Sequence, residues 1–70
     1  MSPGERVRPN RKLSGKLAGK LAEVVEGPLT MGGVSGMWIV AGVEGDTAGT
    51  QETWHQSHLR PANRPNLAAR

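Results

Sequence analysis

The side chains with the most chemical options are a tryptophan and two histidines near the end of the chain. Trp54, His55 and His58 stand close together, and imidazoles at positions i and i+3 could share a metal ion. The chain contains no cysteine, and no aspartate stands nearby to complete a ligand set. Two histidines on one turn also offer no arrangement of nucleophile, base and orienting acid. We therefore predict no metal, no cofactor and no enzymatic activity, and treat these three residues as candidate contacts to a partner.

Cationic side chains are the second group, and they are concentrated at the two ends of the chain. Residues 1–20 carry six Lys and Arg against one Glu, residues 21–59 carry five acidic residues and no Lys or Arg, and residues 60–70 carry three Arg. A basic segment attracts phosphates, but it equally attracts an acidic protein surface, including the middle of its own chain. The residues that we expect to contact nucleic acid are Arg6, Arg8, Arg11, Lys12, Lys16, Lys20 and Arg60.

Length and composition limit the class of protein that can position these side chains. The chain has 70 residues, of which 36% are hydrophobic, ten are glycine and five are proline. So many glycines and prolines favour turns and short elements over long helices. No apolar run approaches the roughly 18 residues of a membrane span, and the N-terminus lacks the order of a signal peptide. We expect one small cytoplasmic domain without membrane association.

Turn residues divide the chain into five short strand candidates. Residues 37–43 (MWIVAGV) are almost continuously apolar, which predicts a central strand covered on both faces. The glycine-rich stretch 28–36 predicts a loop or a wide hairpin tip. Residues 55–57 are too few for a helix and predict a single tight turn. The five predicted strands are residues 5–8, 20–26, 37–43, 50–54 and 58–60.

Residues 12–25 allow two interpretations. Leucines repeat every four residues from Leu13 to Leu21, as on one face of a basic amphipathic helix. However, Gly15 and Gly19 would then lie inside the helix at a cost of about 1 kcal/mol each. We favour a loop over residues 12–19 followed by a strand. In a strand, alternate side chains point to opposite faces, which places Ala22 and Val24 together.

This order of elements resembles the small SH3-like barrels, including the KOW and Tudor-like types, which occur as short domains in high-GC bacteria and their phages. The resemblance is carried by residues 4–8 (GERVR), 19–27 (GKLAEVVEG) and 54–61 (WHQSHLRP). The last of these is similar to the ending in which a single 3₁₀ turn precedes the final strand. The resemblance implies an all-β, five-stranded SH3-like barrel over residues 5–61. Composition predicts flexible termini at residues 1–4 and 62–70.

Two functions remain open for such a binding module. The first is sequence-independent binding of nucleic acid, with Arg6 and Arg8 on one face of the first strand beside Arg60 of the last. The alternative is a protein–protein adaptor, a phage or host regulatory or assembly component, which would use the acidic middle segment and an exposed Trp54. We expect Trp38 in the core. With two Trp and no Phe or Tyr, a methyl-lysine cage cannot be built. The open edges of a small barrel are compatible with a monomer or a homodimer.

Overall fold

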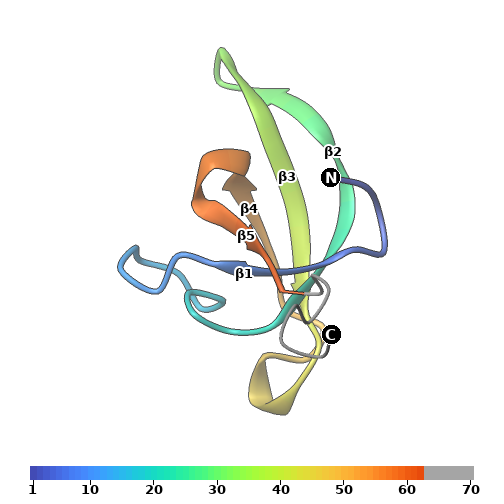
Figure 1. The fold of residues 1–70 in the computed structure, drawn as a ribbon. Coiled ribbons are helices and arrows are strands. Elements are labelled where there is room, and N and C mark those ends of the chain that lie inside the picture. Colours follow the sequence, from blue (N-terminus) through green and yellow to red (C-terminus); the bar gives the residue numbers. More distant parts are fainter. Residues whose placement is uncertain (63–70) are drawn as a thin grey trace, which may run out of the picture.

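The structure, a computed structural model, describes residues 1–62 of the chain. Turn residues set the ends of the five strands in this part. The strands form one sheet in the order β4-β3-β2-β1-β5, and all neighbouring strands are antiparallel (Figure 1). The predicted all-β architecture is confirmed, including the single 3₁₀ turn before the last strand. The elements are β1 (Arg6–Pro9), β2 (Ala22–Met31), β3 (Val34–Gly42), η1 (Gly45–Thr47), β4 (Gln51–His55), η2 (Gln56–His58) and β5 (Leu59–Pro61).

The β2–β3 hairpin is longer than the sequence suggested. The predicted loop or wide tip over residues 28–36 is wrong, because β2 continues to Met31 and β3 begins at Val34. Only Gly32 and Gly33 form the turn, with φ angles of +58° and +82°. A two-residue hairpin turn with positive φ at both positions matches the natural twist of the strands, and glycine adopts this conformation without strain.

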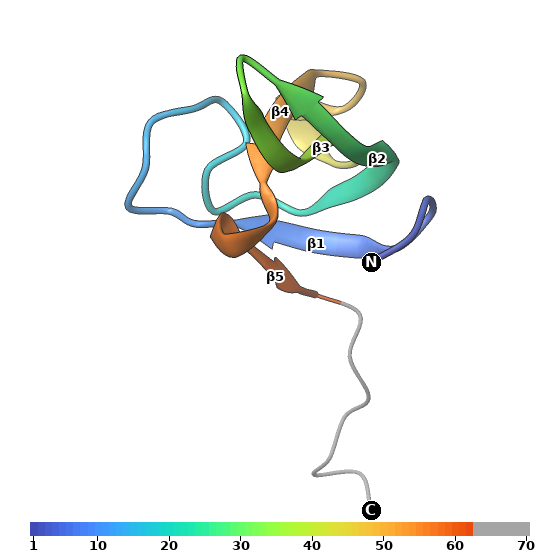
Figure 2. The same ribbon diagram turned by 90° about the horizontal axis from the view of Figure 1, so that it is seen from above.

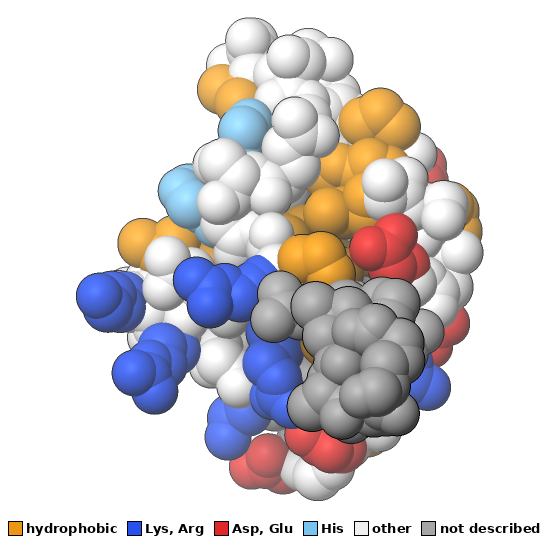
Figure 3. Space-filling view, in the orientation of Figure 1, with side chains coloured by type: hydrophobic (Ala, Val, Ile, Leu, Met, Phe, Trp, Pro, Cys, Tyr) orange, Lys and Arg blue, Asp and Glu red, His pale blue; other side chains and the backbone are white. Residues whose placement is uncertain are grey.

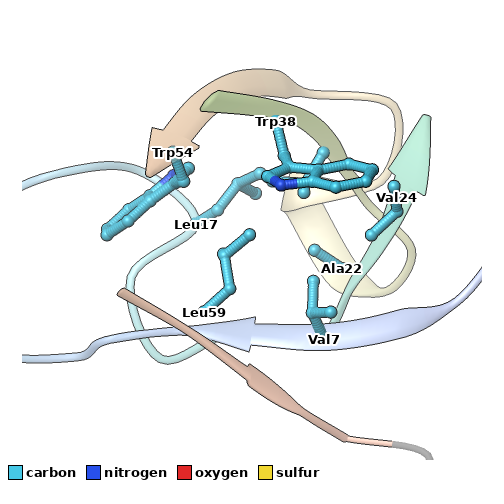
Figure 4. Packing of buried hydrophobic residues seen from close by; sticks show 8 residues of the cluster. Val7, Leu17, Ala22, Val24, Trp38, Trp54 and Leu59 are labelled. Carbon is cyan, nitrogen blue, oxygen red and sulfur yellow. The ribbon is translucent and has the colours of Figure 1, made fainter. Parts of the chain in front are cut away.

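The sheet curls, so that β1 and β5 run side by side across the face formed by β3 and β4 (Figure 2). The core lies between these two layers, with Val7 and Leu59 on one side and Trp38 and Trp54 on the other (Figure 4). The result is a small barrel-like domain with one apolar core. The buried cluster consists of Val7, Leu17, Ala22, Val24, Trp38, Val40, Trp54 and Leu59.

The segment between β1 and β2 is irregular, as the glycines predicted, and the helical interpretation is excluded. Leu17, in the middle of this loop, is fully buried in the core. The backbone N–H of Gly19 donates to the carbonyl of Pro9 at 2.8 Å and anchors the loop against β1. At Gly15 a Cβ atom would lie 2.8 Å from the Trp54 ring. Glycine is therefore needed there for the loop to pass over the core.

Strand β3 is covered on one face rather than on two. Trp38 and Val40 are buried, whereas Met37 and Ile39 on the other face are only half-buried. The prediction of a fully covered central strand is therefore wrong. The reason is that the curled sheet closes around one side of β3, and the described residues provide no second layer for its outer side.

The ends of the described chain continue the sheet's hydrogen bonding. The N–H of Gly4 donates to the carbonyl of Val24 at 2.8 Å, and the N–H of Ala62 donates to the carbonyl of Arg6 at 2.9 Å. The remainder of the predicted C-terminal tail, residues 63–70, lies outside the described residues. Within residues 1–62, no helix has the length and apolar character required to cross a membrane.

Candidate nucleic-acid interface

Two arginines meet where strands β1 and β5 pair. In the antiparallel register Arg8 lies directly opposite Arg60. The neighbouring residues Val7, Pro9 and Leu59 are buried, and side chains alternate along a strand. Both arginines therefore point outward on the same face of the β1–β5 pair, which confirms that the first and last strands bring Arg8 and Arg60 together.

A hollow of about 550 Å³ opens beside this arginine pair, between β1, the loop that follows it and the end of η2. In Figure 3 the Lys and Arg side chains gather at the lower left, over β1 and this loop, with the histidines above them. Among residues 1–62, no aspartate or glutamate lines the hollow. We call it the basic hollow, and its polar lining includes Arg8, Asn10, Arg11, Lys12, His58 and Arg60.

Asn10 gives the loop its shape at this point, a role that the sequence analysis missed. Its side-chain Oδ1 accepts a hydrogen bond from the N–H of Lys12 at 2.8 Å. Its own N–H donates to the carbonyl of His58 at 2.9 Å, which ties the loop to the start of β5. Asparagine commonly bonds the backbone two residues onward in such turns. The Pro9-Asn10 pair at the end of a strand was the available signal.

The electrostatics of the basic hollow are unbalanced. Like charges directly opposite each other on adjacent strands destabilise a sheet. Arg8 is held partly by its Nη1, which donates to the carbonyl of Gly19 at 3.3 Å. Within residues 1–62 neither Arg8 nor Arg60 forms an ion pair. The positive charge of the hollow is therefore available to an anionic ligand.

Three of the predicted cationic residues lie outside the basic hollow. Arg6 is opposite Glu23 in the β1–β2 register, and its Nε lies 3.9 Å from the Glu23 carboxylate. Lys16 lies beside Glu52, on the other side of the loop. Lys20 is exposed but does not line the hollow. The structure thus brings together four of the seven predicted cations. Of the other three, Arg6 pairs with Glu23 and Lys16 lies near the carboxylate of Glu52.

Trp54 is buried, and the expectation that it is exposed is wrong. Only 6% of its surface is accessible, and it lies opposite Trp38 in the β3–β4 pairing. Its indole N–H donates to Glu52 Oε1 at 3.0 Å, so the ring can be buried without leaving its polar atom unpaired. Trp54 is therefore a core residue. Trp38, which the sequence analysis placed in the core, is also buried.

The two histidines have different environments. His55 is half-buried, and its Nδ1 accepts from the N–H of Ser57 at 3.1 Å, which caps η2. His58 is exposed beside the basic hollow, and the two ring centroids are 6.0 Å apart. No group of three or more possible metal ligands occurs among residues 1–62.

Glu52 holds the loop that carries the basic hollow, and no local pattern had pointed to it. Its carboxylate accepts from the N–H groups of Lys16 at 2.7 Å and Leu17 at 3.0 Å, as well as from Trp54. Partial burial alone would raise the pKa of this carboxyl. The three N–H donors and the Lys16 charge outweigh burial, so the pKa lies below its ordinary value.

Comparison of the chain with protein-family models, with curated proteins and with solved structures found no significant match.

Proposed function

We propose that this protein is a non-enzymatic module that binds nucleic acid without sequence specificity through the basic hollow. One observation carries the proposal: Arg8 and Arg60 face each other across adjacent strands, beside Arg11 and Lys12, in a hollow that no carboxylate of the described residues lines. Guanidinium groups match the oxygens of a phosphate with paired hydrogen bonds. A phosphate between the two arginines would turn their mutual repulsion into two attractions.

Binding of this kind depends on the phosphate backbone. Contacts to phosphates hold the ligand in place but carry no sequence information, and they release bound counterions. Affinity should therefore fall steeply as salt rises, with a slope that counts the phosphates contacted.

The fold supports the same proposal. The five antiparallel strands and the 3₁₀ turn before β5 agree with the resemblance to SH3-like barrels of the KOW or Tudor-like type. From the order of the elements and from residues 54–61, we also propose that the domain is an SH3-like barrel of the KOW or Tudor-like type. The adaptor alternative keeps the acidic middle segment but loses the exposed Trp54, which is buried.

The test is a salt titration of binding to fluorescently labelled DNA and RNA, measured by anisotropy. The double variant Arg8→Gln/Arg60→Gln should bind far more weakly, and its salt slope should become shallower by about one for each phosphate that it no longer binds. Arg6→Gln is the matched control, because it removes an arginine from the same strand that is already paired with Glu23. Thermal unfolding of each variant checks that the fold is intact.

Two results would overturn the proposal. One is a wild-type protein that binds neither DNA nor RNA at low salt. The other is a control variant, Arg6→Gln, that loses as much affinity as the double variant, since the basic hollow would then have no special role. Either result would favour the alternative function, binding of a protein partner.

A further inference from the structure

A second hollow lies on the other side of the loop that follows β1, and its walls are mainly apolar. It has a volume of about 690 Å³ and lies between this loop, the end of the β2–β3 hairpin and β4. Three of its side chains are unusually exposed for their type: Leu13 at 39%, Met31 at 46% and Val34 at 50%. We call it the apolar groove, and its walls include Leu13, Met31, Val34, Met37, Trp54 and His55.

The apolar groove and the basic hollow share one lining residue. His58 lines both of them, and it is exposed to solvent between the two. A ligand that occupies both hollows can therefore contact this imidazole. Unstacked bases pack on histidine rings as they do on other aromatic side chains. His55, whose ring lies edge to face with that of His58, extends the same surface into the groove.

The two hollows differ in charge, so each can bind a different chemical group of a ligand. The groove contains the carboxylate of Glu52, whose oxygens accept from Lys16, Leu17 and Trp54. That negative charge repels phosphates, whereas the basic hollow attracts them. A ligand that fits both hollows must carry anionic groups and flat apolar groups side by side along one chain.

Nucleic acid has this chemistry only when its bases are unpaired. In a duplex the faces of the bases are stacked on one another, so they are not available to an apolar groove. In a single strand the bases turn away from the backbone and pack on protein side chains while the phosphates follow a basic surface. Building on the proposed function, we infer that the ligand is single-stranded nucleic acid, with its phosphates in the basic hollow and one or more bases in the apolar groove.

The first experiment compares three labelled probes of equal length at low salt: oligothymidylate, an abasic oligonucleotide and a DNA duplex. Oligothymidylate should bind at least about tenfold more tightly than the abasic strand, which has the same phosphates but no bases. It should also bind more tightly than the duplex. Equal affinity for oligothymidylate and the abasic strand, or a preference for the duplex, would overturn the inference but leave the proposed function intact. If none of the three probes binds at low salt, and labelled RNA does not bind either, the proposed function itself is overturned.

The second experiment removes the apolar groove's character with the double variant Leu13→Ser/Val34→Ser. Both side chains are exposed, so the fold should tolerate their replacement. Affinity for oligothymidylate should fall several-fold, whereas affinity for the abasic strand should not change. Val25→Ser is the matched control, because Val25 is an apolar residue that is 40% exposed and lines neither hollow. A control that loses as much affinity as the double variant would overturn the inference.

Fluorescence provides a readout that does not depend on these variants. In Trp38→Phe the remaining tryptophan, Trp54, lines the apolar groove. Oligothymidylate should shift or quench its emission, and the abasic strand should not. Identical spectra with the two bound probes would show that no base enters the groove.

Discussion

Replacement of Glu52 by glutamine should destabilise the whole domain, although Glu52 is only half-buried in strand β4. Its Oε2 accepts from the N–H of Lys16, while its Oε1 accepts from the N–H of Leu17 and from the Trp54 indole. These bonds join three parts of the molecule: the loop after β1, strand β4 and the core. Glutamine keeps one oxygen for two of the donors, but its amide nitrogen would face the N–H of Lys16.

The size of the effect follows from these bonds. A hydrogen bond to a charged group contributes about 1.5–3 kcal/mol, and one between neutral groups about 1 kcal/mol. In Glu52→Gln the 2.7 Å bond from the Lys16 N–H is lost. The bonds from Leu17 and Trp54 become weaker, because a neutral oxygen replaces the carboxylate. Since the Lys16 N–H is exposed, we expect a loss of about 2 kcal/mol. A core of this size supplies no more than about 3–5 kcal/mol, so the denaturant midpoint should fall by about half.

The measurement is urea unfolding followed by tryptophan fluorescence at pH 7 and again near pH 3. The folded-state pKa of Glu52 is below its ordinary value of 4.5. Its contribution is therefore fully present above that value and is lost as the pH falls through the folded-state pKa. The difference in stability between the wild type and Glu52→Gln should be largest at pH 7 and should narrow at acidic pH. Other carboxylates cancel in this difference.

Glu26→Gln is the matched control, since it makes the same change of charge at an exposed residue that forms no side-chain hydrogen bond within residues 1–62. Its midpoint should stay close to that of the wild type. A wild-type midpoint for Glu52→Gln at pH 7 would refute the reasoning. A stability difference of the same size at both pH values would refute the role of the charge.

Three further predictions concern the core, and denaturant unfolding measures each of them. Val40→Ala should cost about 1–3 kcal/mol because Val40 is fully buried, and Ile39→Ala should cost less because Ile39 is half-buried; equal costs would contradict the one-sided burial of β3. Gly27→Ala should destabilise strongly, since its Cβ would lie 2.5 Å from the Trp38 ring, and an unchanged midpoint would show that the ring can move. Trp38→Phe should change stability by less than about 1 kcal/mol, because the buried Trp38 Nε1 has no hydrogen-bond partner within residues 1–62. Trp54→Phe should cost more because it breaks the bond to Glu52; the reverse order would contradict this assignment.

The sequence by itself determined the elements whose signals are local. Glycines and prolines mark the ends of the predicted strands. Gly15 and Gly19 oppose a helix whatever the surrounding tertiary structure, because their effect on helix stability is local. Alternation placed Ala22 and Val24 on one face of β2, and the structure shows that this face is buried. The wide tip was mispredicted because a dense run of glycines does not reveal which two of them make the turn.

Only the tertiary structure decided which residues meet across long stretches of chain. Leu17 enters the core, and Trp54 is buried, because Glu52 binds the backbone of a loop 35 residues earlier. The composition of residues 1–20 indicated a basic surface, but it could not separate Arg8, which faces Arg60, from Arg6, which faces Glu23. Strand register decides such pairings, and register depends on how the whole sheet closes over its core, because a shift of one residue turns every side chain to the opposite face.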